Sequence, residues 1–341
     1  MTTRLCVIEG DGIGREVVPA AVEVLQAIMP DLEIVQARAG WQTYLDCGVS
    51  VPEETLDAVR ECGAALFGAV SSPSRKVNGY RSAIVTMRQK LGLYANVRPV
   101  FSLPAVSHKE NVDLVIVREN TEDLYSGRER SEDGMAIAER VITSCASHRI
   151  AMRAAEVLRL GGRRRVTIVH KATILPLTDG LFRDTARAAL EKTRQPYEDW
   201  EIDEMLVDTA AYQLAAAPQN FDVLVTTNLF GDILSDEAAH WCGGMGLAPS
   251  INWGDDLAVA EPVHGSAPDI AGKGIANPIA TILSAALLAR YYWKQPTVAD
   301  GIERAVYQAL EWDIREDGRI PPVLSTDEIK NAVLRQLEHA L

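Results

Sequence analysis

Residues 5–28 read LCVIEGDGIGREVVPAAVEVLQAI, and their pattern indicates the fold class of the chain. Leu5–Ile8 is a short apolar run of the kind that forms a buried β-strand, and Glu9 closes it too early for a signal peptide. Val17–Ile28 repeats apolar residues at the spacing of a helix that packs one face against a sheet. A strand, a glycine-rich turn and a helix in this order predict the opening unit of an α/β domain.

The turn at 10–14 reads GDGIG and lies where a Rossmann fold binds the phosphates of a dinucleotide. That fingerprint needs glycines at its first, third and sixth positions, whereas Arg15 occupies the sixth position here. The spacing therefore argues against a Rossmann site. Two interpretations stay open: a turn whose amides approach a ligand, and a plain connection from strand to helix.

The same alternation continues outward along the chain. Short β-branched runs are followed by longer segments of helical period, which predicts a parallel sheet covered by helices. The further predicted elements are Leu32–Ala37, Glu53–Arg60, Ala64–Gly68, Val112–Val117, Ala146–Leu160, Val166–His170, Gly180–Arg194, Val223–Thr226, Asn277–Leu288, Val298–Leu310 and a last helix from Ser325 to near Leu341.

Two stretches predict that the chain crosses between two bodies: 96–108, which contains Pro and Ser, and 243–250, where Gly, Pro and Ser cluster. A chain of 341 residues also exceeds the roughly 100–150 residues of a typical single domain. We predict a large domain made of 1–98 and 250–341, and a small domain of 99–249 inserted between them.

Composition excludes several classes of partner. The chain has 34 Lys and Arg against 47 Asp and Glu, so its formal net charge is −13, whereas a nucleic-acid partner needs a basic surface. No apolar stretch approaches the ~18 residues that span a bilayer, so no membrane partner is expected. Five cysteines without close spacing argue against a disulfide framework or a zinc site and favour a reducing cytoplasm.

Three arginines on successive elements, Arg88, Arg98 and Arg118, are candidates for binding a substrate with two or three carboxylates. The planar guanidinium holds a carboxylate through two parallel hydrogen bonds, which lysine cannot do. Arg118 directly follows the apolar strand 114–117, and ligands of α/β proteins bind at the carboxyl ends of strands. Ordinary surface ion pairs are the alternative.

Asp232 and Asp236 are four residues apart after the strand Val223–Thr226, so on a helix they project from one face. Oxygen ligands of this kind suit Mg²⁺ or Mn²⁺, and Asp208 is a candidate for a third. A solvated acidic helix start is the alternative. Lys171 and Tyr125 are candidate proton-transfer groups, or exposed structural residues.

A long glycine-rich loop at 261–278 runs into a helix. Such a loop is able to wrap a nucleotide, although a loop that only caps the helix has the same composition.

Together these segments resemble the β-decarboxylating dehydrogenases, the family of isocitrate, 3-isopropylmalate, homoisocitrate and tartrate dehydrogenases. The resemblance covers nearly the whole chain. It implies an α/β fold of the isopropylmalate dehydrogenase type, with two α/β domains that share a sheet, which is not a Rossmann fold. Its motifs here are 9–14 (EGDGIG), Arg88, 94–99 (YANVRP), 118–122 (RENTE), Lys171, 228–236 (NLFGDILSD) and the loop 264–277.

The resemblance implies how substrate and metal are bound. In this family three arginines hold the carboxylates of a malate-type substrate, and aspartates from two subunits hold Mg²⁺ or Mn²⁺ beside the substrate hydroxyl. By position, the arginines are Arg88, Arg98 and Arg118, and the metal ligands are Asp232, Asp236 and, from a second subunit, Asp208.

A lysine and a tyrosine complete the implied mechanism. Lys171, also from the second subunit, removes the proton of the substrate hydroxyl, and Tyr125 donates a proton to the enol carbon once CO₂ has left. A site divided in this way makes a dimer the smallest active assembly, so a homodimer or homotetramer is expected. The polar segment near 126–145 is then an arm that pairs with another subunit.

The resemblance also places the cofactor in the 264–277 loop instead of a Rossmann turn. Asp269 accepts hydrogen bonds from the ribose hydroxyls of adenosine and repels a 2′-phosphate, which favours NAD⁺ over NADP⁺. The implied cofactor-binding residues are Glu261, His264, Gly265, Ser266, Ala267, Asp269 and Asn277.

Substrate choice depends on the segment that precedes Arg88. Isopropylmalate enzymes usually carry leucines there, whereas this chain has Arg81, seven residues before Arg88 and on nearly the same helical face if the helix extends that far. A cation suits a substrate whose third-carbon substituent ends in a carboxylate. This segment, with Ser72 as a further substrate-binding residue, looks most like homoisocitrate dehydrogenases, which implies oxidative decarboxylation of homoisocitrate to 2-oxoadipate in lysine biosynthesis.

Other functions stay open at this point. Within the same chemistry, the alternatives are 3-isopropylmalate, isocitrate and tartrate or malate as substrate. A non-catalytic regulatory subunit of the same fold is disfavoured because all the metal-binding and proton-transfer residues are present. A magnesium-dependent phosphotransferase is disfavoured because the glycine turn lacks the Gly-Lys-Ser/Thr ending of a P-loop.

Overall fold

The computed structural model describes residues 3–73, 75, 77–313 and 324–338. The chain forms two compact units, which are described separately. The first unit contains Met1–Leu93, Ser102–Glu110 and Ala239–Leu341, and the second contains Tyr94–Phe101 and Asn111–Ala238. The domain ranges given above stay a prediction.

The first unit contains a mixed sheet in the strand order β2-β1-β3-β12-β11. β1 (Arg4–Gly10) pairs in parallel with β2 (Glu33–Ala37) and with β3 (Ala64–Ala69), and β3 pairs in parallel with β12 (Ala258–Pro262). β11 (Pro249–Trp253) runs antiparallel to β12. β3 is buried at every position because helices cover both faces of this sheet.

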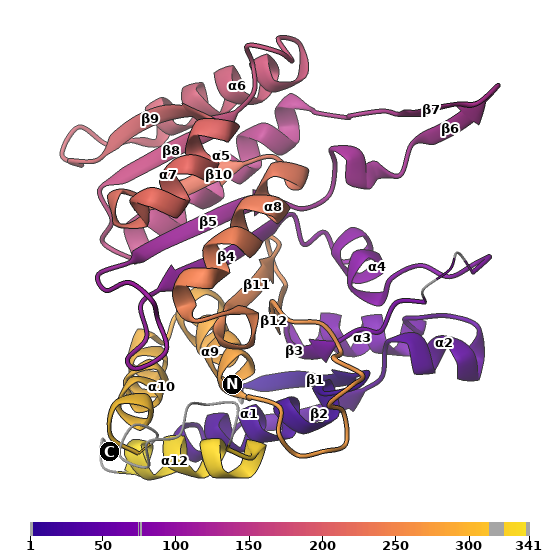
Figure 1. Ribbon diagram of the computed structural model, residues 1–341, viewed down its shortest axis with the longest axis vertical. Helices are drawn as coiled ribbons and strands as arrows, with labels where there is room; N and C mark the ends of the chain where they lie inside the picture. Colours follow the sequence, from indigo (N-terminus) through magenta and orange to yellow (C-terminus); the bar gives the residue numbers. More distant parts are fainter. Residues whose placement is uncertain (1–2, 74, 76, 314–323, 339–341) are drawn as a thin grey trace. The chain divides into compact units, whose positions relative to one another are not determined.

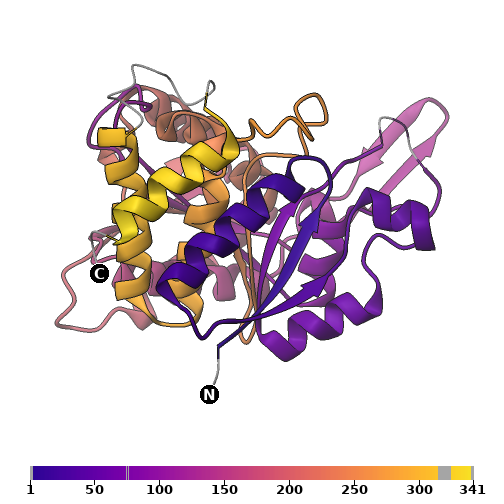
Figure 2. The same ribbon diagram turned by 90° about the horizontal axis from the view of Figure 1, so that it is seen from below.

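One face of this sheet is covered by α1 (Gly14–Ile28) and α9 (Ile279–Leu287). α10 (Pro296–Gln308) and α12 (Thr326–Glu338) pack outside these two helices, and Figure 2 shows α12 in yellow lying across them. Every residue of α9 is buried, as expected for a helix between a sheet and an outer helical layer.

The other face is covered by α3 (Glu53–Cys62) and α4 (Ala83–Lys90), with α2 (Trp41–Cys47) in the connection after β2. Met87 of α4 and Phe67 of β3 belong to one apolar core on this face. Arg88, the residue after Met87, is thereby fixed in position by the burial of its neighbour.

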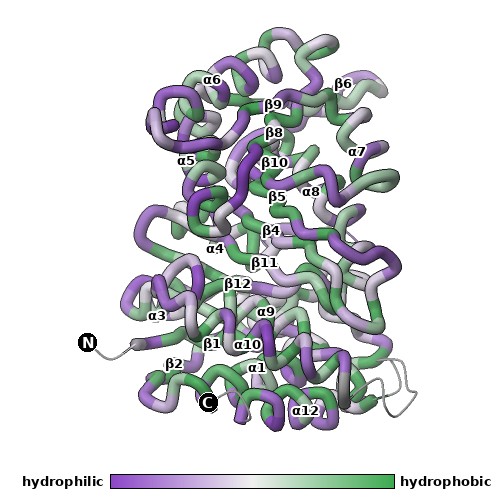
Figure 3. The backbone as a smooth tube through the Cα atoms, turned by 90° about the vertical axis from the view of Figure 1, so that its left-hand side faces the viewer, coloured by the Kyte–Doolittle hydropathy of each residue, from purple (hydrophilic) through white to green (hydrophobic). Residues whose placement is uncertain are grey.

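The strands of the second unit belong to the same 10-stranded sheet and follow the order β4-β5-β10-β8-β9. β5 (Asp113–Glu119), β10 (Val223–Thr226), β8 (Arg165–His170) and β9 (Glu201–Leu206) are parallel, so their carboxyl ends meet at one edge. β4 (Ala95–Phe101) runs antiparallel to β5. The apolar residues of β10 stand out in green in Figure 3.

Helices also cover both faces of the sheet formed by the strands of this unit. α5 (Ser144–Leu160) and α6 (Thr178–Thr193) pack on one face, and α7 (Val207–Ala216) and α8 (Asn228–Ala238) on the other. The short helical segments of the described chain are η1 (Leu124–Ser126), η2 (Pro218–Asn220), η3 (Ala239–Cys242), η4 (Met245–Leu247), η5 (Leu288–Tyr292) and η6 (Ala309–Asp313).

A two-stranded hairpin extends from the second unit (Figure 1). Its strands are β6 (Glu129–Glu132) and β7 (Met135–Ala138), paired antiparallel, and all but one of their residues are exposed. An isolated two-stranded hairpin of this kind is marginally stable in water. It occupies the segment predicted as an intersubunit arm, and that role stays a prediction.

The structure confirms the predicted α/β class, and each predicted strand and helix is present within a few residues. The predicted parallel pairing is present between most neighbouring strands, and the structure adds the antiparallel strands β4 and β11. The last helix is described to Glu338, and its predicted end near Leu341 lies outside the described residues. No helix among the described residues is long and apolar enough to cross a bilayer.

Candidate active site

The carboxyl edge of the second unit's sheet collects most of the predicted catalytic residues. Arg118 lies at the end of β5, Lys171 directly follows β8, Asp208 is at the start of α7 after β9, and Asp232 is on α8 after β10. The parallel pairing of these four strands places their connecting loops side by side.

Arg118 is buried at this edge and hydrogen-bonded to α8. Its Nε and Nη2 donate to Asn228 Oδ1 at 3.0 and 2.7 Å, and its Nη1 donates to Asp232 Oδ1. A Cβ at Gly231 would lie 2.6 Å from Arg118 Cγ, so glycine is needed on α8 for the arginine to pass. The guanidinium also lies over the Tyr125 ring, 5.0 Å from its centroid.

Arg98 reaches the same helix from β4. Its Nη1 donates to Asp236 Oδ1 at 2.6 Å and to Ser235 Oγ at 2.8 Å, while Asn96 Oδ1 accepts from its Nε at 2.7 Å. Asp232 Oδ1 lies 4.0 Å from Arg98 Nη2. Two arginines therefore offset the repulsion between the two aspartates on one face of α8.

Tyr125 is a neutral donor in this cluster. Its hydroxyl donates to Asp232 Oδ2, and burial, together with this carboxylate, raises the pKa of Tyr125 above its ordinary value. The side chain thus keeps its proton at neutral pH, as a general acid requires.

The donor set on α8 fits a hard divalent cation. Asp232 and Asp236 offer carboxylate oxygens from adjacent turns, and 33% and 52% of their side-chain surface is exposed. Within the described residues of one chain, no group of three or more acidic, histidine or cysteine side chains gathers as a complete metal site. A further ligand from outside the chain, as the sequence predicts for Asp208, is consistent with this arrangement.

Lys171 and Asp208 form a separate pair. Lys171 Nζ donates to Asp208 Oδ1 at 2.5 Å, and this contact lowers the pKa of Asp208. Both predicted partner-subunit residues thus lie together, as they need to if they serve the same site.

His170 shapes the turn that carries Lys171. Its Nδ1 accepts from Ala172 N at 3.1 Å, and burial lowers the pKa of His170 more than Glu204, 3.8 Å from Nε2, raises it. As pH falls through about 6.5, the unfolded chain protonates this histidine before the folded chain does. The free energy of unfolding therefore decreases on acidification.

His170→Gln tests this link. We expect urea unfolding between pH 7.5 and 5.5 to show a smaller loss of stability in the variant, by at most ~1.4 kcal/mol per pH unit for one proton. Equal pH slopes in the two proteins would show that His170 is not the group responsible.

In the first unit, Arg88 is held from two sides. Its Nε donates to Asn252 Oδ1 at 3.0 Å and its Nη2 to Glu261 Oε1 at 2.8 Å, and Asn252 Nδ2 donates to the same Glu261 oxygen at 2.7 Å. Glu261, predicted from the sequence as a cofactor-binding residue, therefore orients Arg88 in this structure.

The GDGIG turn connects distant segments of the first unit through hydrogen bonds. The buried Asp11 carboxylate accepts from the backbone N–H groups of Trp41, Gln42 and Ser71 at 2.7, 3.0 and 2.9 Å. Ile13 N donates to Ser266 O at 2.9 Å, so the turn also supports the predicted cofactor loop. The role of Asp11 could not be predicted from the sequence, because its partners are 30 to 60 residues away.

The predicted cofactor loop follows β12. His264 Nδ1 lies 2.9 Å from Gly265 O, and its buried Nε2 has no hydrogen-bond partner among the described residues, which leaves an acceptor for a ligand donor. Ala267 has a φ of 38°, an uncommon conformation for a residue with a side chain and one that clusters at functional sites. These features fit a nucleotide, while Asp269 is exposed and Asn277 Oδ1 accepts from Ile279 N at the start of α9.

The helical-spacing argument for Arg81 is wrong. α4 begins at Ala83, with Ser82 as its N-cap, so Arg81 lies outside the helix that carries Arg88. Arg81 and Ser72 are both exposed in the segment before α4, and Ser74 and Lys76 of that segment lie outside the described residues. The roles of Arg81 and Ser72 in substrate binding stay predictions.

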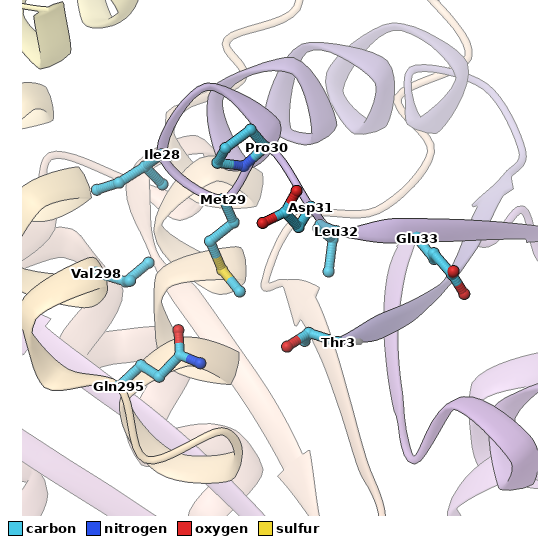
Figure 4. A pocket seen from close by; sticks show the side chains of 9 residues that line it. All are labelled: Thr3, Ile28, Met29, Pro30, Asp31, Leu32, Glu33, Gln295 and Val298. Atoms are coloured by element: carbon cyan, nitrogen blue, oxygen red, sulfur yellow. The ribbon is translucent and has the colours of Figure 1, made fainter. Parts of the chain in front are cut away.

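Figure 4 shows a pocket of about 850 Å³ at the amino ends of β1 and β2 in the first unit. Thr3 precedes β1, Leu32 precedes β2, and Gln295 and Val298 lie at the start of α10. Ligands of α/β proteins bind outside the carboxyl ends of the strands, whereas this pocket lies at the amino ends. It contains none of the predicted site residues.

Comparison with known proteins places this geometry in a family. Residues 4–333 match the family described as isocitrate/isopropylmalate dehydrogenase. The chain belongs to this family. The crystal structure of isocitrate dehydrogenase from Methylococcus capsulatus matches with a TM-score of 0.89 at 41% identity, covering 98% of this chain and 99% of that one.

Two relatives of this dehydrogenase differ in their substrates. An isocitrate/homoisocitrate dehydrogenase of Thermus thermophilus is 52% identical over 311 residues, covering 91% of this chain and 92% of the relative. A 3-isopropylmalate/3-methylmalate dehydrogenase of Methanocaldococcus jannaschii is 47% identical over 313 residues, covering 90% and 91%. The protein is thus a decarboxylating dehydrogenase of a small hydroxy acid, from a family that generally uses NAD or NADP with Mg²⁺ or Mn²⁺.

Proposed function

We propose that this dehydrogenase, with a divalent metal bound, converts homoisocitrate and NAD⁺ into 2-oxoadipate, CO₂ and NADH, a step of lysine biosynthesis in the cytoplasm. The observation that carries the proposal is the cluster on α8, where Arg98 and Arg118 lie against Asp236 and Asp232 and Tyr125 donates to Asp232. One helix, α8, thus has beside it arginines for the substrate carboxylates, carboxylate oxygens for a metal, and a tyrosine that can donate a proton.

Substrate binding is assigned to arginines that the fold has already oriented. Arg98 and Arg118 are held by Asn96 and Asn228, so each guanidinium is fixed before a carboxylate arrives. Arg88, held by Asn252 and Glu261, is assigned to a further carboxylate. Mg²⁺ or Mn²⁺ bound by Asp232, Asp236 and the Asp208 of a second subunit would polarise the substrate's hydroxyl and, after oxidation, its carbonyl oxygen.

Proton transfers are assigned to Lys171 and Tyr125. Lys171 of the second subunit takes the hydroxyl proton as a hydride leaves the second carbon for NAD⁺. The bond to the β-carboxylate then breaks, CO₂ departs with its electron pair left on the third carbon, and Tyr125 returns a proton to that carbon. Its raised pKa keeps Tyr125 protonated for this step.

A second copy of the chain is proposed to supply Lys171 and Asp208. Large apolar side chains that a soluble surface rarely displays follow Lys171: Ile174 is 68% and Leu177 86% exposed. Leu181, on the first turns of α6, is also exposed. This surface and the β6–β7 hairpin support a homodimer, or a homotetramer built from dimers.

NAD⁺ is proposed as the cofactor because Asp269 offers a carboxylate to ribose hydroxyls. We expect Asp269→Lys to raise the KM for NAD⁺ roughly 10- to 100-fold, because one charge-assisted hydrogen bond is lost. The variant should also use NADP⁺ better relative to NAD⁺. Initial rates of NAD(P)H formation measure both. The control is Asp31→Lys, which makes the same charge change at an exposed residue before β2. If Asp269→Lys left the cofactor preference unaltered, the cofactor would not bind at Asp269.

Arg81 is proposed to favour a carboxylate on the substrate's third-carbon substituent. We expect Arg81→Leu to shift the ratio of kcat/KM values about tenfold toward 3-isopropylmalate, since one exchanged charged contact is worth ~1.4 kcal/mol or more. Arg38→Leu, another exposed arginine of the first unit, is the control. An equal loss on both substrates would mean that Arg81 does not select between them.

A substrate panel tests the whole proposal. Purified protein with NAD⁺ is given homoisocitrate, isocitrate, 3-isopropylmalate and malate, with and without Mg²⁺, and NADH absorbance is followed. We expect the highest kcat/KM on homoisocitrate and none without metal. The 47% identical 3-isopropylmalate/3-methylmalate dehydrogenase makes 3-isopropylmalate the second candidate, and a large preference for it would overturn the first.

A further inference from the structure

A buried ion cluster behind the α8 site is not used by the proposed chemistry. Arg140 donates through Nε to Asp123 Oδ1 at 2.7 Å, and its Nη1 lies 3.0 Å from Asp179 Oδ1. Asp123 and Asp179 are both fully buried, and 13% of the Arg140 side chain is exposed. One guanidinium thus serves two buried carboxylates.

Each member of this cluster fixes a loop that bears a site residue. Asp179 Oδ2 accepts from the backbone N–H of Lys171 at 2.9 Å. Asp123 Oδ2 accepts from Leu229 N at 3.0 Å in the first turn of α8, where a carboxylate also interacts favourably with the helix dipole. Asp123 is, in addition, two residues before Tyr125.

Arg140 makes two further contacts with the start of α8. Its Nη2 donates to Thr227 Oγ1 at 2.7 Å, and its guanidinium lies 4.5 Å from the centroid of the Phe230 ring. Phe230 is two residues before Asp232. The loops after β5, β8 and β10 therefore converge on a single side chain.

Stability alone is a weak reason for such a cluster. Burial raises the pKa of Asp179, which means that keeping this carboxylate charged costs free energy. Buried ion pairs are often no more stabilising than apolar residues of similar volume, and their best-attested role is to specify one arrangement of the groups around them.

We propose that Arg140 is a positioning residue that ties the Lys171 loop to the α8 metal-binding helix. Under the proposed function, on which this inference rests, α8 serves the site of its own chain and Lys171 serves the site of the partner. One side chain then sets the geometry of groups in two active sites.

The matched variants are Arg140→Lys and Arg163→Lys. Arg163 has 14% of its side chain exposed and links the amino ends of β5 and β10, where its Nη1 donates to Asp113 O at 2.8 Å and lies 3.5 Å from Asp222 O. Lysine keeps the charge in both variants but lacks the planar fork that reaches several acceptors. Thermal unfolding of each verifies that it folds.

Calorimetry of Mn²⁺ binding is the readout that does not depend on activity. We expect Arg140→Lys to weaken Mn²⁺ binding about tenfold and to lower kcat about 10- to 100-fold at saturating metal, the usual range for partners of metal ligands. Arg163→Lys is expected to leave both unchanged. Wild-type Mn²⁺ affinity in a folded Arg140→Lys protein would overturn the inference.

Variants that each remove one contact separate the link to α8 from the link to the Lys171 loop. Thr227→Val removes the hydrogen bond of Arg140 at the start of α8 and should weaken Mn²⁺ binding more than it lowers kcat at saturating metal. Asp179→Asn weakens the tie to the Lys171 loop and should lower kcat with Mn²⁺ affinity unchanged. The same response from both variants would contradict the assignment, and both remain measurable if Arg140→Lys fails to fold.

Hybrid dimers of one wild-type and one Arg140→Lys chain, isolated by two different tags, test the link between sites. If Arg140 acts on both loops, each of the two sites contains one impaired element, and the hybrid falls well below half of wild-type kcat. Retention of half the activity overturns the inference. Failure of the shared site itself is recognised separately, by the complementation of Lys171→Ala with Asp232→Asn that closes the Discussion.

Discussion

Asp232→Asn should lower kcat/KM at least ~10³-fold, a loss of about 4 kcal/mol in transition-state stabilisation, while the Kd for NAD⁺ stays within twofold. Asp232 accepts from both Arg118 and Tyr125 and projects with Asp236 from α8. The asparagine keeps the shape and one oxygen acceptor but removes the charge that attracts a divalent cation. NADH absorbance over a Mg²⁺ titration and calorimetry with NAD⁺ measure the two effects.

The control for this variant is Asp184→Asn on α6. Asp184 is 68% exposed and pairs with its neighbour Arg183, so its amide should alter neither turnover nor metal dependence. Thermal unfolding with and without Mn²⁺ adds a second test, since a ligand that binds only the folded state raises its stability. If the Asp232→Asn enzyme had the wild-type kcat, α8 would not be the metal-binding helix.

Lys171→Ala should lower kcat 10²- to 10⁴-fold, the range expected when a general base is removed. The substrate KM should change little, because the carboxylates are assigned to arginines on other elements. Loss of Lys171 also leaves Asp208 without the cation that lowers its pKa, so metal affinity should be compared in the same preparation.

Lys192→Ala, at the exposed end of α6, is the matched control for this removal of a positive charge. We expect it to behave as wild type. If the Lys171→Ala enzyme retained more than half of the wild-type kcat across neutral pH, Lys171 would have no role in proton transfer.

The sequence predicts best those features that depend on nearby residues. β1 and α1 follow from the apolar spacing of residues 5–28, and the shared face of Asp232 and Asp236 follows from a spacing of four on α8. Such patterns need only the local periodicity of the chain.

The features that sequence reasoning missed depend on distant partners. β4 contains Pro99, which lacks a backbone donor, so its stretch looked like a crossing between domains. Arg140 meets Asp179 across 39 residues, and Asp11 meets Ser71 across 60. Only the register of the sheets brings these residues together, and no motif in the sequence encodes it.

Arg81 shows the opposite error, where a local pattern was extended too far. Seven residues separate it from Arg88, which places two side chains on one face only when the whole interval is helical. Ser82 caps α4 instead, so the helix is too short for the argument.

Complementation between two inactive chains tests whether the active site is shared between subunits. Lys171→Ala and Asp232→Asn chains are unfolded together, refolded as a mixture and assayed with homoisocitrate, NAD⁺ and Mg²⁺. In half of the randomly formed dimers, one of the two sites receives an intact Asp232 from one chain and an intact Lys171 from the other. We predict recovery of about a quarter of the activity of wild-type protein refolded in the same way. A mixture as inactive as either variant alone would place both residues in the site of a single chain and contradict the account.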